Sequence, residues 1–224
     1  RLIKVWRSRH LATLSPCHLV SSHLVTLSPC HLACHRYTSS MSKTIRQHRM
    51  RYTTDVGKTA VALVTHFLNT RWADYTVAVH SVEDDPAYQP HDVDLLWTIV
   101  DGNGRLRVIP LEVKGDRYHN TGNFFLETVS NADKQTAGCF LYTRARWLFY
   151  VFIEVGDLYC LPMDIARPWF AENSDRFREA RTSTPVGQDS YVTIGRLVPI
   201  QTLCEEIPAT LHWRKAGEAW QQIT

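Results

Sequence analysis

Residues 91–96 read His91-Asp92-Val93-Asp94-Leu95-Leu96, and residues 109–116 read Ile109-Pro110-Leu111-Glu112-Val113-Lys114-Gly115-Asp116. Both stretches predict strands. Because successive strand side chains point to opposite faces, Glu112 and Lys114 share one face of their strand. If the two strands are neighbours, several carboxylates and one ammonium meet at the edge of an apolar sheet. Carboxylates gathered in this way bind a hard divalent cation, and a lysine beside them can position or activate a water.

The composition is typical of one globular domain. The chain has 224 residues, of which 44% are hydrophobic and 21% charged, so we expect one well-buried domain with some extension. No apolar run approaches the roughly 18 residues that span a bilayer, so no membrane segment is expected. Cys139, Cys160 and Cys204 lie among apolar residues and are interpreted as buried thiols, which makes a cytoplasmic location the default.

The net charge of +3 conceals an asymmetry along the chain. Residues 1–54 hold nine Lys or Arg and no acid, whereas the remainder holds 16 basic and 22 acidic residues. The presumed core is therefore mildly acidic, and any face that binds nucleic acid must be local. The basic stretch 41–54 is expected to be mobile. An arm that touches phosphate and a solvated leader are both open interpretations of it.

The first forty residues differ from the rest. The segment His10–Leu19 recurs almost unchanged as His23–Leu32, a period too short for a solenoid repeat. We expect residues 1–40 to be a disordered or spurious extension, with functional translation starting at Met41. The alternative is a zinc site through Cys17, Cys30 and Cys34, whose spacing matches no compact finger pattern.

From Asp55 the pattern predicts a single α/β domain over 55–224. The residues 101–104, Asp101-Gly102-Asn103-Gly104, are a strong hairpin turn between two of the expected strands. Helices are predicted over 56–72, 143–147, 164–181 and 200–206, the last before a tail. Strands are predicted over 75–80, 93–100, 106–114, 124–129, 148–155, 158–161 and 191–198.

Asp94 with Leu95-Leu96, a turn, and then Leu111-Glu112-Val113-Lys114 together resemble the PD-(D/E)xK nuclease superfamily. In that superfamily a helix precedes a hairpin that bears an Asp on one strand and Glu-x-Lys on the next. Thr121-Gly122-Asn123, Glu127 and Gly138 extend the similarity to a phage-type branch, over residues 55–155. The resemblance implies a restriction-endonuclease-like fold, in which helices flank a mixed central sheet.

The resemblance implies catalytic roles for Asp94, Glu112 and Lys114. Asp94, Glu112 and the carbonyl of Val113 would hold Mg²⁺, for which Mn²⁺ can substitute, while Lys114 orients the attacking water. No proline directly precedes Asp94, so Asp92 competes for the ligand role. The helix 56–72 also lacks the glutamate that many members carry, which leaves Glu83, Asp84, Asp85 or Glu127 to complete the site. Further site candidates are Asp92, Asp116, Asn123 and Glu127, and candidates for phosphate contacts are Arg144, Arg146 and Lys134.

The expected function is metal-dependent hydrolysis of DNA by a metal-activated water. Its main rival is a nucleic-acid-binding or assembly protein that keeps the fold without catalysis, as the acidic core suggests. A plainer alternative is that Glu112 and Lys114 are an ordinary solvated strand face. Many relatives cut both strands as dimers, so a homodimer is an open alternative.

Overall fold

The computed structural model describes residues 46–47, 50–186 and 189–223, which all belong to one compact unit, Ile45–Thr224. The start at Met41 and the zinc alternative at Cys17, Cys30 and Cys34 lie outside the described residues. No helix in the described part of the chain is long and apolar enough to cross a membrane.

The larger of two sheets is mixed and has seven strands. Only β4 and β7 run parallel, and every other neighbouring pair is antiparallel. The strand order is β12 (Ala219–Ile223), β11 (Leu211–Ala216), β8 (Asp157–Pro162), β7 (Trp147–Phe152), β4 (Leu106–Asp116), β3 (Leu95–Val100) and β2 (Thr76–Ser81).

The second sheet has five strands and is built around β10. Its long strands β9, β10 and β5 are antiparallel neighbours, and the short β1 pairs in parallel with β9. The order is β1 (Arg46–Gln47), β9 (Arg178–Val186), β10 (Asp189–Pro199), β5 (Asn123–Asn131) and β6 (Thr136–Ala137).

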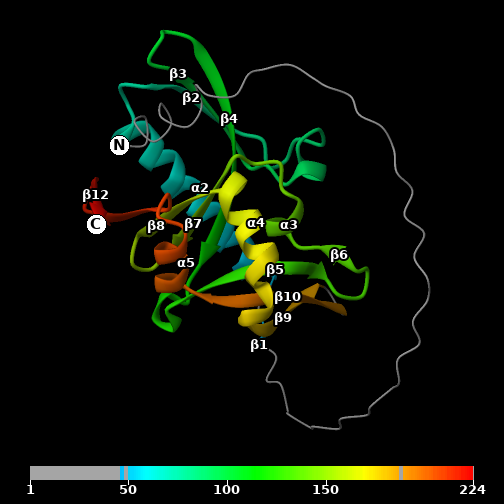
Figure 1. Cartoon of the computed structure of the whole chain (residues 1–224). Coiled ribbons are helices and arrows are strands. Elements are labelled where there is room, and N and C mark those ends of the chain that lie inside the picture. Colours follow the sequence, from blue (N-terminus) through cyan, green and yellow to red (C-terminus); the bar gives the residue numbers. More distant parts are fainter. Residues whose placement is uncertain (1–45, 48–49, 187–188, 224) are drawn as a thin grey trace, which may run out of the picture. The chain divides into compact units, whose positions relative to one another are not determined.

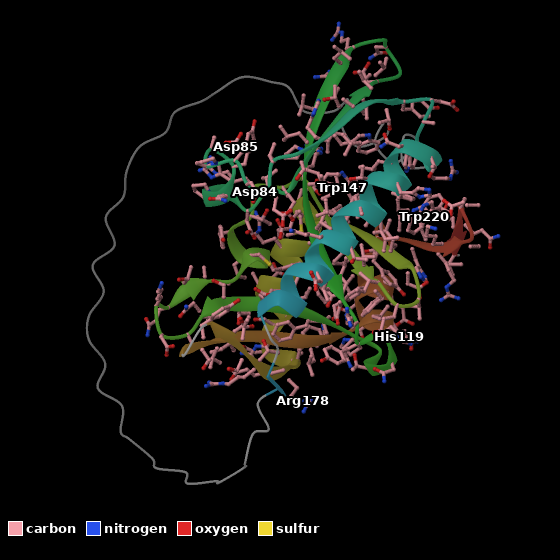
Figure 2. All side chains as sticks on the ribbon, turned by 180° about the vertical axis from the view of Figure 1, so that it is seen from behind. Asp84, Asp85, His119, Trp147, Arg178 and Trp220 are labelled. Atoms are coloured by element: carbon pink, nitrogen blue, oxygen red, sulfur yellow. The ribbon has the colours of Figure 1, made fainter. Side chains whose placement is uncertain are left out.

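Helices flank both faces of the seven-stranded sheet. The long helix α2 (Met50–Arg71) lies in front of the strands in Figure 2, whereas α4 (Met163–Asn173) lies in front of them in Figure 1, which is viewed from the opposite side. The other helical elements are α3 (Cys139–Tyr142), α5 (Ile200–Glu206) and three 3₁₀ turns, η1 (Gln89–His91), η2 (His119–Thr121) and η3 (Ser174–Arg176). The α/β class and the helix-flanked mixed sheet predicted from the sequence are confirmed.

Helix α2 forms because its apolar residues recur at helical spacing. Val56, Ala60, Val64, Phe67 and Leu68 are all buried, so one stripe faces the sheet. The Phe67 ring lies 6.2 Å from that of Phe149 on β7 and 5.4 Å and 5.2 Å from Trp213 and Trp220 of the β11–β12 hairpin. These contacts anchor the helix against the middle and one edge of the sheet.

The opposite face of the sheet carries the main core. Side chains of β7 and β8 pack there with those of β5, α4 and β10, and Phe124 meets Tyr150 with ring centroids 4.9 Å apart. The Tyr150 hydroxyl accepts a hydrogen bond from the Phe125 N–H, 3.1 Å away. The five-stranded sheet therefore lies on the face of β7 that is turned away from α2.

Four element predictions differ from the structure. The first helix begins at Met50, so the basic segment expected to be mobile contributes its first turn, and Arg46–Gln47 form β1. The helix expected over 164–181 ends at Asn173, because Arg178–Val186 instead pair with β10 as β9. The short helix lies at Cys139–Tyr142 rather than 143–147, since the Thr143 hydroxyl turns to the Asp92 carbonyl, 2.6 Å away. The expected tail forms the β11–β12 hairpin.

Candidate functional site

Alternation along β4 separates an α2-facing side from a side that carries polar groups. A Cβ added to Gly115 would lie 2.9 Å from Val56 and 3.0 Å from Ala60, so the odd-numbered positions of this part of β4 face α2. Glu112 and Lys114 consequently point to the other side, toward β5. Glu112 is buried and only 6% exposed, which rules out the interpretation of this strand face as ordinary and solvated at Glu112.

Asp94 lies directly before β3 and is fixed to β4. Its N–H donates to the Leu111 carbonyl at 2.9 Å, and its Oδ2 accepts the Val113 N–H at 2.8 Å. The Asp94 carboxylate is therefore turned across to the Glu-x-Lys strand. The contact between Val113 and this carboxylate is made by the Val113 N–H rather than by the carbonyl that was expected to bind the metal.

Asp92 and Asp94 both precede β3, so the strand predicted over 93–100 begins only at Leu95. Asp92 closes the η1 turn with φ 51° and ψ 57°, a left-handed conformation that is uncommon outside glycine. The Thr143 hydroxyl bonds to its carbonyl at 2.6 Å, and the Tyr142 side chain hydrogen-bonds its carboxylate. These contacts hold the Asp92 carboxylate against the segment that follows α3.

Burial and mutual repulsion shift the pKa values of the three carboxyl groups upward. Burial, opposed by the Val113 hydrogen bond and reinforced by the Asp92 charge, raises the pKa of Asp94 to about 6. Burial, followed by the charges of Asp94 and Asp92, raises the pKa of Glu112 well above its usual range. Glu112 also hydrogen-bonds Asp94. A cation between these groups would lower all three pKa values.

Two carboxylate oxygens in this cluster, Glu112 Oε2 and Asp92 Oδ2, are buried and have no hydrogen-bond partner among the described residues. Buried polar atoms are normally paired, because leaving one unpaired costs about 1–3 kcal/mol. Oxygen atoms from Asp92, Asp94 and Glu112 are the donor type that Mg²⁺ and Mn²⁺ prefer. The residues therefore fit a divalent cation.

A fourth side chain at the cluster was missed from the sequence, the thiol of Cys139 at the start of α3. Ligand atoms of Asp92, Glu112 and Cys139 all lie within 4.8 Å of one another. Burial, and then the nearby Glu127 charge, raise the pKa of this thiol. No motif in the sequence marks Cys139, since it meets the acids only through the placement of α3.

Lys114 forms an ion pair with Glu127 on β5, and both side chains are largely buried, with 28% and 13% exposed. Burial alone would lower the pKa of Lys114, but the Glu127 charge and the hydrogen bond to Glu127 outweigh burial and raise the pKa. Lys114 is therefore protonated, and Glu127 holds its ammonium beside the carboxylates. Glu127 is brought to the site as its partner.

Two other candidates are engaged elsewhere in the structure. The Asp116 carboxylate accepts hydrogen bonds from the Tyr150 hydroxyl and from the Tyr118 N–H at 2.8 Å. The Asn123 side chain donates to the Thr121 carbonyl within its own loop. Neither residue shares the cluster formed by Asp92, Glu112 and Cys139.

The proposed phosphate-binding side chains are exposed. Arg144 and Arg146 follow α3, and their N–H groups donate to the His91 carbonyl at 2.9 Å and the Pro110 carbonyl at 2.8 Å, which places this segment beside the acidic loop. Lys134 lies in the turn between β5 and β6.

Among the loop acids expected to complete the site, Glu83 is the one whose charge acts on Asp94. Asp85 caps its own loop by accepting the Ala87 N–H at 2.9 Å. Figure 2 shows Asp84 and Asp85 together on the loop after β2, far from His119 in the loop after β4. Of these three loop acids, Glu83 therefore lies near enough to Asp94 to influence its carboxylate.

No family model matches the chain, and no curated protein or solved structure matches it either.

Proposed function

We propose that this protein is a metal-dependent nuclease of the PD-(D/E)xK type that hydrolyses DNA. The observation that carries the proposal is that Asp94, Glu112 and Lys114 meet on one side of β4. Asp94 accepts the Val113 N–H at 2.8 Å, Glu112 hydrogen-bonds Asp94, and Lys114 follows two residues later on the same strand face. This is the juxtaposition that the hairpin motif predicts.

Each residue has a distinct role in the proposed reaction. Asp94 and Glu112 would hold Mg²⁺ or Mn²⁺, with Asp92 or the Val113 carbonyl as further oxygen donors. When bound, the ion would polarise the phosphodiester and lower the pKa of a water. Lys114, restrained by Glu127, would orient that water and balance charge on the scissile phosphate.

Two exposed arginines lie on the segment after α3, beside the proposed site. Arg144 and Arg146 are exposed on the segment that hydrogen-bonds to His91 and Pro110, so they can reach phosphates flanking the site. This basic pair supplies local attraction on an otherwise acidic domain. A cytoplasmic, phage or mobile-element setting and action as a homodimer belong to the same proposal.

The second candidate is a nucleic-acid-binding or assembly protein without catalysis. The pairing of Lys114 with Glu127 favours it, because the ammonium already has a counter-charge. For catalysis, Lys114 must either orient the water while it stays paired with Glu127 or leave Glu127 and pair with the phosphate.

Incubation of the purified full chain with duplex, single-stranded and branched DNA, with Mg²⁺ or Mn²⁺, tests the proposal. We expect cleavage that EDTA abolishes and that Asp94→Ala and Lys114→Ala each reduce by about 10²-fold or more. Lys58→Ala and Asp164→Ala change an exposed lysine and an exposed acid and should cut normally. No cleavage of any substrate, or full activity in the two site variants, would contradict the nuclease and favour the second candidate.

A further inference from the structure

Three different elements converge on one small space at the acidic cluster. Asp92 comes from the end of η1, Glu112 from β4 and Cys139 from the first position of α3. Their ligand atoms lie within 4.8 Å of one another, and they are the one such group among the described residues. Two of these donors are oxygen and the third is sulfur.

The cluster contains a buried carboxylate oxygen with no hydrogen-bond partner in the described part of the chain. Glu112 is 6% exposed, and the unpaired atom is its Oε2. Asp92 Oδ2 is in the same situation. The Lys114 ammonium is paired with Glu127 and makes no hydrogen bond to either of these two oxygens. An oxygen so deeply buried and unpaired points to a ligand that binds there.

The backbone holds the thiol at this place. A Cβ on Gly138 would lie 2.4 Å from the Glu127 carbonyl carbon and oxygen, so only glycine permits the close approach that sets α3 on β5. The Gly138 N–H donates to the Thr128 carbonyl at 2.9 Å, and the Thr143 hydroxyl ties the end of α3 to Asp92. One end of α3 is therefore fixed to β5 and the other to Asp92, which keeps Cys139 near the Asp92 carboxylate.

We propose that Asp92, Glu112 and Cys139 bind a divalent ion of borderline softness, such as Zn²⁺ or Co²⁺, with Cys139 as a thiolate ligand. Mg²⁺ does not favour sulfur, whereas Zn²⁺ and Co²⁺ accept both sulfur and oxygen. Glu112 belongs to this metal site and to the proposed nuclease site. The chemical role of the ion therefore rests on the proposed function, whereas binding of the ion does not.

Binding releases the protons that the ligands carry. The Cys139 S–H bond breaks, the sulfur–metal bond forms, and the thiol proton passes to solvent together with the proton shared by Glu112 and Asp94. A tetrahedral ion with bonds of about 2.0–2.3 Å sets its ligands roughly 3.5 Å apart, so shifts of about 1 Å complete the site. Three protein ligands leave a fourth position open to water or to a phosphate oxygen, as in catalytic zinc sites.

Titration of the full chain with Co²⁺ tests the proposal, because a thiolate–cobalt bond gives an intense near-ultraviolet charge-transfer band that oxygen ligands do not give. All measurements use a background in which Cys17, Cys30 and Cys34 are replaced by Ser, so that these thiols cannot contribute. We expect the band to saturate at one ion per chain and Zn²⁺ to remove it by competition. Cys139→Ser should abolish it and weaken Co²⁺ binding by about tenfold or more.

Cys204→Ser is the matched control, since Cys204 is also a half-buried free thiol but lies on α5. It should leave the band unchanged. Asp92→Asn should weaken Co²⁺ binding while the band persists at high Co²⁺, as expected for an oxygen ligand. No band in the background protein, or one that survives Cys139→Ser, would overturn the proposal.

The two proposals can fail separately. A Cys139-dependent band without cleavage of any DNA would refute the nuclease and leave the thiolate site standing. Mg²⁺-dependent cleavage without the band would do the opposite.

Discussion

The Lys114 ammonium on β4 forms an ion pair with the Glu127 carboxylate on β5, which joins the two sheets at the candidate site. Because both side chains are largely buried, removal of either partner leaves a charge that water cannot fully solvate. The pair therefore links the stability of the fold to the position of the group proposed to orient the attacking water.

Glu127→Gln should lower the free energy of unfolding by about 2 kcal/mol, less than for a fully buried pair. Urea denaturation of the wild type, Glu127→Gln, Lys114→Met and the double variant measures this as a double-mutant cycle. The double variant should lose less stability than the sum of the two single variants. Strict additivity would show that the two residues do not interact.

Asp94→Asn should alter how stability depends on pH when EDTA is present. Burial raises the pKa of Asp94 to about 6, above its value of 3.8 in an unfolded chain. The folded state therefore holds this proton more tightly, so its contribution to stability is complete below pH 3.8 and is lost as the pH rises through about 6. Relative to the wild type, the variant should gain stability between about pH 4 and about pH 6 and keep this gain at higher pH. Asp133→Asn, an exposed acid, serves as the control, and an equal gain in both variants would contradict the assignment.

Gly138→Ala should lower the free energy of unfolding by about 1–3 kcal/mol, because the new methyl group would meet the Glu127 backbone at 2.4 Å. Gly57→Ala is the control, since no atom of the described residues lies within 4 Å of a Cβ at that helical position. It should instead raise the free energy of unfolding by about 0.5–1 kcal/mol. Thermal unfolding of the two variants compares them directly. Equal tolerance at both positions would show that α3 is not fixed to β5 as described.

Asp157→Asn should destabilise the β8–β11 pairing without an effect on DNA cleavage. The Asp157 carboxylate is 8% exposed and accepts hydrogen bonds from Arg214 at 2.6 Å and 2.8 Å. We expect a loss of about 1–3 kcal/mol in the free energy of unfolding by urea. Asp175→Asn changes a fully exposed acid 3.7 Å from Arg196 and should have almost no effect. A loss of cleavage in Asp157→Asn at a temperature where it stays folded would contradict this purely structural role.

Local sequence patterns predicted the elements whose own residues determine them. Helix α5 begins and ends at the predicted residues, Ile200 and Glu206, and the turn at Asp101–Gly104 forms because the Asp101 side chain accepts the N–H groups of Asn103 and Arg105. Strand β9 was missed because its conformation depends on pairing with β10 rather than on its own composition.

The site was predictable only where chemistry and spacing lie in one short motif. Glu112 and Lys114 are two apart on a strand, so their shared face followed from the sequence. Cys139 and the pairing of Glu127 with Lys114 depend on how β5 and α3 pack on β4. The left-handed conformation of Asp92 at the end of η1 leaves no mark in the sequence, so the position of its carboxylate could not be predicted.

The proposed chemistry depends on a cation bound by the buried Glu112 carboxylate. Calorimetric titration of Mn²⁺ into the full chain, with the wild type and Glu112→Gln compared, tests this most directly, because Gln keeps the shape and removes the charge. We predict saturable binding to the wild type that is weakened at least about tenfold in Glu112→Gln. No binding to the wild type, or equal binding to both proteins, would show that Glu112 does not bind a divalent cation.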